Sequence, residues 1–201
     1  MTGRLLLVRH GQTEWAQAGR HTGRTDVPLT ELGEQQAREL EPWATALGPV
    51  PVLCSPLQRA RRTAQLAGFA RPAEPDDDLL EWDYGGYEGL TTAQIRQQTG
   101  QPDWQVFTGG VVPGDTPGET LAQVATRAGR VIDRVEVMLT QGDVVLVAHA
   151  HVLRVLAACW LQAEPEFGQH LLLDPASVSA LGVERNVRVV HEWNLRFTRP
   201  E

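Results

Sequence analysis

Two short runs of uninterrupted apolar residues constrain the fold more than any other feature of the sequence. Residues 5–8 and 144–148 carry no polar side chain, a pattern typical of strands covered on both faces of a parallel sheet. The first run ends at Arg9-His10 and the second at His149. Open α/β sheets place their ligand sites at the carboxyl ends of such strands. We therefore expect both histidines to lie at one edge of a central sheet.

Helical patterns alternate with these strands. Apolar residues recur every three or four positions over residues 118–140, which predicts the clearest helix of the chain. The other predicted elements are strands near residues 52–54, 178–183 and 187–193 and helices over residues 31–47, 92–99 and 151–161. We predict an α/β fold, a three-layer α/β/α sandwich with a mostly parallel central sheet and helices on both faces, formed by residues 1–201 as a single domain.

Proline sets two of the expected helix boundaries. A helix is expected to start at Ser55-Pro56, with the serine as its cap and the proline in its first position, where a missing N–H is no loss. Pro42 is expected to end or kink the helix over residues 31–47. Residues 10–29, 71–90 and 108–118 are expected to be loops.

Composition and net charge argue against some classes of partner. With 201 residues and 42% apolar side chains, the chain can bury a core without disulfides. Its formal net charge of −7 argues against nucleic acid or an anionic membrane as the main partner. Cys54 and Cys159 lie in apolar runs and are expected to be reduced thiols of a cytoplasmic protein. No apolar run is long enough for a membrane span. The sequence leaves open whether the chain forms a homodimer.

Four separated groups are expected to meet at the sheet edge. Arg59 lies near the amino end of the helix that follows Ser55, and Arg9 precedes His10. Two guanidinium groups, the imidazoles of His10 and His149 and a positive helix end suit a tetrahedral dianion such as phosphate. A neutral histidine can attack phosphorus. An alkoxide leaving group then needs a proton from a carboxylic acid.

The candidate acid lies in residues 79–89. Glu81 follows two leucines and precedes a tryptophan, and Asp83 and Glu88 lie in the same segment. A solvated loop with three scattered acids is the structural alternative for this segment.

Taken together, the motifs resemble the histidine phosphatase superfamily, which includes cofactor-dependent phosphoglycerate mutases and many small-molecule phosphatases. The resemblance rests on Arg9-His10-Gly11, on Ser55-Pro56-x-x-Arg59-Ala60-x-x-Thr63-Ala64, on Glu81 ahead of Tyr84-Gly85, and on Val147-Ala148-His149. It implies that His10 is the phosphorylated nucleophile and Glu81 the proton donor. It also implies a phosphoryl clamp of Arg9, Arg59 and His149, with no metal and no cofactor.

A narrower resemblance concerns the substrate pocket. The stretches around Thr22-Gly23 and Tyr84 resemble a branch of bacterial acid phosphatases and fungal sugar-bisphosphatases, which implies that these residues line the pocket. Gly11 lacks a β-carbon, so a ligand can approach the backbone there. Ala150 stands where the family usually has glycine, and His151 either reaches the substrate or caps the following helix.

For the remaining charged and aromatic residues, the sequence either leaves two roles possible or indicates a structural role. Arg24 either neutralises a second anionic group of the substrate or pairs locally near Asp26. His21, His170 and His191 are expected to be surface or structural histidines. Trp43, Trp160 and Trp193 are expected to belong to the core.

Three hypotheses about function follow. The first is a metal-independent phosphatase that hydrolyses small phosphorylated metabolites through a phosphohistidine. The second is a phosphoglycerate mutase, which is disfavoured because Arg96 is the only basic residue between Gly89 and Gly118. The third is a non-catalytic phosphate-binding module, which would need neither His10 nor Glu81.

Overall fold

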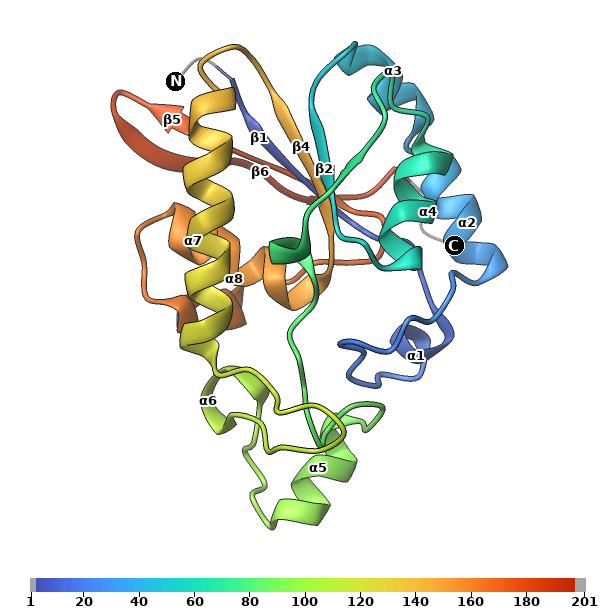
Figure 1. The fold of residues 1–201 in the computed structure, drawn as a ribbon, viewed down its shortest axis with the longest axis vertical. Coiled ribbons are helices and arrows are strands. Elements are labelled where there is room, and N and C mark those ends of the chain that lie inside the picture. Colours follow the sequence, from blue (N-terminus) through green and yellow to red (C-terminus); the bar gives the residue numbers. More distant parts are fainter. Residues whose placement is uncertain (1–2, 198–201) are drawn as a thin grey trace.

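The central sheet orders its strands as β3-β2-β4-β1-β5-β6. A computed structural model describes residues 3–197 (Figure 1). The strands are β1 (Leu5–Arg9), β2 (Val52–Cys54), β3 (Glu74–Pro75), β4 (Val144–Ala148), β5 (Val178–Glu184) and β6 (Val187–Leu195). The first four strands are parallel to one another. Strand β5 pairs antiparallel with β1, and β6 pairs antiparallel with β5 at the edge of the sheet. The predicted mostly parallel sheet is confirmed.

The helices lie around this sheet in chain order. They are α1 (Glu14–Gln17), α2 (Glu31–Arg38), α3 (Glu41–Leu47), α4 (Gln58–Ala67), α5 (Thr92–Thr99), α6 (Val106–Gly109), α7 (Leu121–Met138) and α8 (Ala150–Trp160). Two 3-10 helices span Asp77–Leu79 and Pro165–His170. No helix within residues 3–197 is long and apolar enough to cross a membrane.

The side chains of β1 and β4 point alternately to the two faces of the sheet, so the core has two layers. Leu5 and Leu7 pack with residues of α7 and α8. Leu6 and Val8 pack with residues of α3 and α4 on the other face. Because successive strand residues point to opposite faces, an uninterrupted apolar run supplies both cores at once. The result is the predicted three-layer α/β/α arrangement, with α7 and α8 gathered away from α2–α4 in Figure 1.

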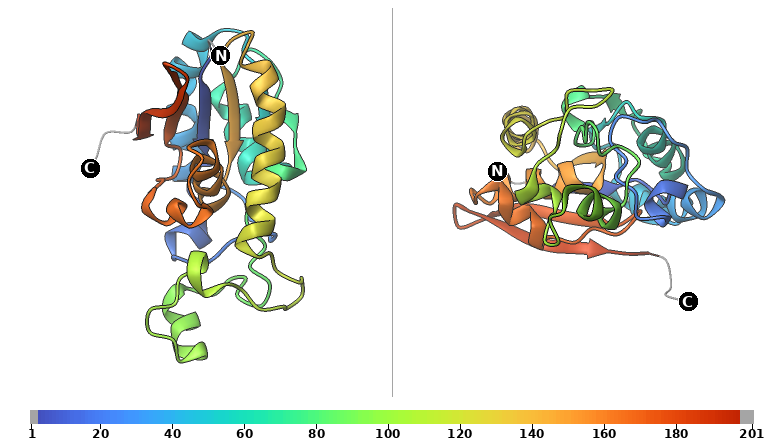
Figure 2. Two further views of the ribbon diagram at one scale, coloured as in Figure 1. Left: turned by 90° about the vertical axis from the view of Figure 1, so that its left-hand side faces the viewer. Right: turned by 90° about the horizontal axis from the view of Figure 1, so that it is seen from below.

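The segment with α5 and α6 extends beyond the carboxyl ends of the parallel strands (Figures 1 and 2). It begins with a capping box at Thr91, whose hydroxyl accepts from the Gln94 backbone N–H. It ends at Thr120, which caps α7 in the same way through Gln123. Helix α6 lies partly in a region expected to be a loop. This segment closes over the sheet edge that carries the predicted site residues.

Of the two helix boundaries expected near proline, the one near Pro42 is found and the one at Ser55-Pro56 is not. The predicted break near Pro42 is found, because α2 ends at Arg38 and α3 starts at Glu41 with proline in its first turn. The predicted cap at Ser55 is wrong. Helix α4 starts later, with Leu57 as its N-cap. The Ser55 hydroxyl accepts from the Leu57 backbone N–H at 3.4 Å, just ahead of the helix, and from His149 Nε2 at 2.7 Å.

Candidate active site

Parallel pairing of β1 with β4 brings the two strand-end histidines together. Arg9 pairs with Ala148 in the register of the strands, and the next backbone N–H, that of His10, donates to the Ala148 carbonyl at 2.9 Å. The imidazole of His10 then lies against that of His149, with ring centroids 5.0 Å apart. Both rings are buried. The convergence expected from the two apolar runs is therefore present.

Local hydrogen bonding fixes the tautomer of His10. Its Nδ1 lies 2.7 Å from the Gly11 carbonyl oxygen, which can only accept, so Nδ1 carries the proton and Nε2 keeps its lone pair. Burial, and then the nearby charges of Arg59 and Arg9, lower the pKa of His10 well below its usual value. The ring is neutral at physiological pH. A neutral imidazole with a free Nε2 is a nucleophile.

Arg59 is the second residue of α4 and is fully buried. Its Nε donates to His149 Nδ1 at 3.1 Å, which leaves the His149 proton on Nε2, facing Ser55. The Arg59 terminal nitrogens donate to the carbonyl groups of Thr22, Gly23 and Thr25. This guanidinium therefore holds the segment over residues 22–25 and the His149 ring together.

A cavity of about 290 Å³ opens in front of His10. Of the predicted site residues, Arg9, His10, Thr22, Glu81, Tyr84, Ala150 and His151 line it. Arg59 and His149 lie one layer behind this wall. The volume of the cavity is at the lower end of the range for small-molecule binding sites.

Two predicted glycines are needed for close packing. A β-carbon on Gly11 would lie 2.3 Å from the Gly33 carbonyl oxygen, and one on Gly23 would lie 2.4 Å from that of Trp82. Neither glycine lines the cavity. Backbone contact with α2 and with the Trp82 segment therefore explains both positions.

Glu81 joins the cavity to the start of α8. Its Oε1 accepts from the backbone N–H groups of Trp82 and Val152, both at 2.9 Å, and its Oε2 accepts from that of His151 at 3.0 Å. The carboxylate thus occupies the amino end of the helix, where N–H groups lack partners within the helix. The side chain is buried but lines the cavity.

The other two acids of this segment have different positions. Asp83 accepts from the backbone of Gly85 and the hydroxyl of Thr116. Glu88 accepts from the backbone of Gly23 and Thr25. Both stabilise loops, and neither lines the cavity. Of the three acids in residues 79–89, only Glu81 is positioned to reach a ligand beside His10.

His151 does not cap α8. The N-cap residue is His149, whose side chain makes no capping bond. The His151 ring lines the cavity, and its Nδ1 shares a hydrogen bond of 2.6 Å with the Tyr84 hydroxyl. Burial lowers the pKa of His151 and raises that of Tyr84. Two neutral polar groups therefore face the space beyond His10.

Sequence reasoning missed several residues of the cavity wall, among them Arg20, His21 and Arg154. His21, expected to be surface or structural, lies in the wall beside Tyr84 and His151. Arg154 also lines it, with Nε and Nη2 bonded to the carbonyl groups of Gly168 and Gln169. Arg154 comes three residues after His151 on α8, a spacing that places both on one face and could have revealed it.

Arg24 was expected either to face the substrate or to pair locally near Asp26, and it does neither. It pairs with Glu119, its Nη2 lying 3.3 Å from Oε2, and it does not line the cavity. Asp26 instead accepts from the backbone N–H of Gln58, at the start of α4.

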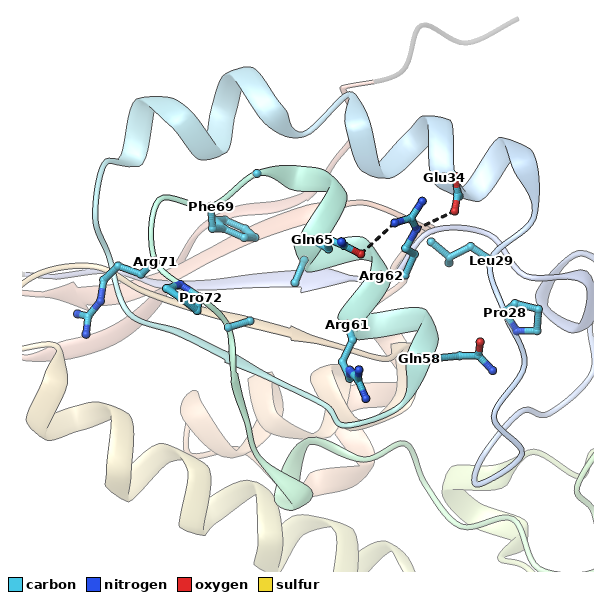
Figure 3. Close-up of a pocket in the computed structure, with 13 residues that line it drawn as sticks. Pro28, Leu29, Glu34, Gln58, Arg61, Arg62, Gln65, Phe69, Arg71 and Pro72 are labelled. Carbon is cyan, nitrogen blue, oxygen red and sulfur yellow. Dashed lines mark hydrogen bonds and ion pairs between the residues drawn. The ribbon is translucent and has the colours of Figure 1, made fainter.

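A second, larger hollow of about 710 Å³ lies along α4 (Figure 3). Arg61, Arg62 and Arg71 line it, with Arg62 paired to Glu34. It contains no histidine and none of the predicted site residues, so the chemistry lies in the smaller cavity. Within residues 3–197, no cluster of three His, Cys, Asp or Glu side chains has the arrangement of a metal site.

The fold and this site define the class of protein. The chain belongs to the histidine phosphatase superfamily (branch 1), whose family model matches residues 5–196. This confirms the resemblance seen in the motifs.

Particular relatives agree with the family. The chain is 41% identical over 192 residues to an acid phosphatase of Mycobacterium tuberculosis, covering 92% of this chain and 89% of that one. It is 35% identical over 188 residues to sedoheptulose 1,7-bisphosphatase of Saccharomyces cerevisiae, covering 80% of this chain and 68% of that one. The solved structure of the open reading frame Rv3214 from Mycobacterium tuberculosis matches with a TM-score of 0.91 and 38% identity, over 98% of this chain and all of that one.

The buried histidines make folding stability depend on pH. Burial lowers the pKa of His21 to about 4, against about 6.5 in an unfolded chain. The unfolded state therefore binds more protons below pH ~6.5, and the free energy of unfolding falls as the pH falls from there toward about 4. His21 alone should contribute about 1.4 kcal/mol per pH unit, measured by urea unfolding.

His21→Gln should remove this part of the slope. Thr92→Val is the matched control, because it removes the hydroxyl 3.2 Å from His21 Nε2 but keeps the titrating ring. It should lower stability at every pH without flattening the slope. An unchanged slope in His21→Gln would contradict a His21 ring that stays neutral in the folded state.

Proposed function

We propose that this protein is a metal-independent phosphatase that hydrolyses small phosphorylated metabolites through a phosphohistidine on His10. The observation that carries the proposal is the neutral His10 ring, held by the Gly11 carbonyl with Nε2 free, in a cavity that also exposes Glu81. The names of the two relatives, an acid phosphatase and a sugar-bisphosphatase, support a hydrolase.

The first half of the reaction transfers the phosphoryl group. His10 Nε2 attacks phosphorus in line, an N–P bond forms, and the bond from phosphorus to the ester oxygen breaks. Glu81 gives its proton to that oxygen, so the leaving group departs as a neutral alcohol. Arg9 lines the cavity, and its buried Nε has no hydrogen-bond partner within residues 3–197. That N–H is a donor suited to a phosphoryl oxygen.

The second half returns the enzyme to its starting state. The Glu81 carboxylate, now unprotonated, takes a proton from water as the water oxygen attacks phosphorus. The N–P bond breaks, inorganic phosphate leaves, and His10 regains its lone pair. In this proposal Arg59 acts from behind His10, where its positive charge supports the anionic phosphoryl group. The neutral His149 ring accepts from Arg59 Nε and helps to hold that guanidinium in place.

The segment over the site, residues 89–118, favours a phosphatase over a mutase. Arg96, the single basic residue between Gly89 and Gly118, is exposed, and its Nε donates to the Trp104 carbonyl. It does not line the cavity. The segment over the site therefore offers no cluster of cations to hold a phosphorylated acid for return of the phosphoryl group. The presence of both His10 and Glu81 also argues against a binding module.

A direct assay tests the reaction class. Purified protein with excess chelator should release inorganic phosphate from phosphorylated metabolites, and His10→Ala should abolish this release while keeping the fold. With 3-phosphoglycerate and its bisphosphate cofactor, phosphate release should be faster than isomer exchange. Loss of activity in chelator, or isomer exchange that outruns release, would contradict the proposal.

The role of Glu81 is tested by the leaving group. Glu81→Gln should slow hydrolysis of an alkyl ester such as glycerol 3-phosphate by roughly 10²–10⁴-fold, the usual effect of a positioned acid. It should slow 4-nitrophenyl phosphate much less, because that leaving group departs without a proton. Asp83→Asn is the matched control, since this buried acid in the same segment does not reach the cavity. Equal losses on both esters in Glu81→Gln would rule out the assignment.

A further inference from the structure

An ion pair outside the cavity joins the buried guanidinium of Arg127 to the partly buried carboxylate of Glu119. It holds the backbone on both sides of Glu81. Arg127, in the middle of α7, is 5% exposed. Its Nε and Nη2 donate to the two carboxylate oxygens of Glu119, at 2.9 and 3.1 Å. Its Nη1 donates to the carbonyl groups of Asp78 and Leu80, at 2.8 and 2.5 Å. Leu80 immediately precedes Glu81.

Glu119 holds the residues on the other side of Glu81. Its Oε2 accepts from the Asp83 backbone N–H at 3.0 Å, and its own backbone N–H donates to the Asp83 carbonyl at 2.9 Å. Its carbonyl accepts from Trp82 Nε1 at 2.7 Å. The Glu119–Arg127 pair therefore fixes the backbone before and after the proton donor.

Glu81 depends on this backbone for its placement. The hydrogen bonds to its carboxylate come from the backbone of Trp82, His151 and Val152. A shift of the chain at Leu80 or Asp83 would move the carboxylate relative to α8 and to the ester oxygen. The donor must come within hydrogen-bond reach of that oxygen, so a small shift costs rate.

Stability alone does not require charges at these two positions. A buried ion pair loses solvation on folding, and apolar residues of similar volume often stabilise a core as well or better. What apolar residues cannot do is donate to the carbonyl groups of Asp78 and Leu80 and accept from Asp83. Each of these three contacts is made by a charged group, which makes a stronger hydrogen bond than a neutral one.

We propose that Glu119 and Arg127 are positioning residues that hold Glu81 in line with the leaving oxygen. This inference rests on the proposed role of Glu81 as proton donor. Glu119 also accepts from Arg24, whose segment contributes the carbonyl groups of Thr22, Gly23 and Thr25 to Arg59. The pair thus links the acid to the segment that surrounds the Arg59 guanidinium.

The test compares two esters in variants of α7. Arg127→Gln removes the bidentate contact, and Arg127→Lys keeps the charge but cannot donate in the same fork. Arg130→Gln is the matched control. Arg130 lies one turn further along α7 and pairs with the Asp78 carboxylate at the surface, without touching Leu80 or Glu119. Rates are measured on glycerol 3-phosphate and on 4-nitrophenyl phosphate, with thermal unfolding of each variant.

Arg127→Gln should lower kcat on glycerol 3-phosphate by roughly 10²-fold, the scale expected for a displacement of about 1 Å. On 4-nitrophenyl phosphate the loss should be only a few-fold. Arg127→Lys should show the same preference with a smaller loss, and it serves as the test if Arg127→Gln does not fold. Arg130→Gln should leave the ratio of the two rates unchanged.

A double variant separates this inference from the role of Glu81. Adding Arg127→Gln to Glu81→Gln should cause no further loss on glycerol 3-phosphate, because residues acting as a unit are not additive. If Glu81→Gln shows leaving-group dependence but Arg127→Gln and Arg127→Lys slow both esters equally, or if the losses add, the pair is merely structural. If Glu81→Gln shows no such dependence, the acid assignment fails and the positioning inference fails with it.

Discussion

The parallel register between β1 and β4 is the constraint on which the site depends. Arg9 pairs with Ala148, so the residues that follow, His10 and His149, leave the sheet side by side. A slip of one residue would turn every side chain of a strand to the opposite face. Leu5 and Leu7 would then exchange cores with Leu6 and Val8. Core packing on both faces therefore fixes the distance between the two imidazoles.

The second constraint is the burial of positive charge in an acidic chain. The formal net charge is −7, yet Arg59 is fully buried beside His10 and His149. Its guanidinium is satisfied by His149 and by carbonyl groups of residues 22–25. None of these partners carries a negative charge, and the positive charge of the guanidinium acts on the two neighbouring imidazoles. The same charge helps to lower the pKa of both histidines, which keeps His10 unprotonated.

The sequence allowed the strands and the convergence of their ends to be predicted, because apolar runs and the residues that end them are local patterns. It did not allow the partners of long side chains to be predicted. The Ser55 hydroxyl also accepts from His149, and Arg24 pairs with Glu119, and both partners are distant in the sequence. The hydrogen bond from Arg127 to the Leu80 carbonyl is equally non-local. It depends on how α7 packs against residues 78–80, which no residue pattern specifies. Arg154 is different, because its spacing from His151 on α8 is a local pattern.

The most direct test of the account is to trap the phosphorylated enzyme. The protein would be mixed with labelled substrate, quenched in alkali within milliseconds, digested and mapped. The account predicts an acid-labile phosphoramidate on His10, attached at Nε2 because Nδ1 carries the proton held by the Gly11 carbonyl. His10→Ala should show no label. Label on a serine or on His149, or phosphate release from His10→Ala at the normal rate, would contradict it.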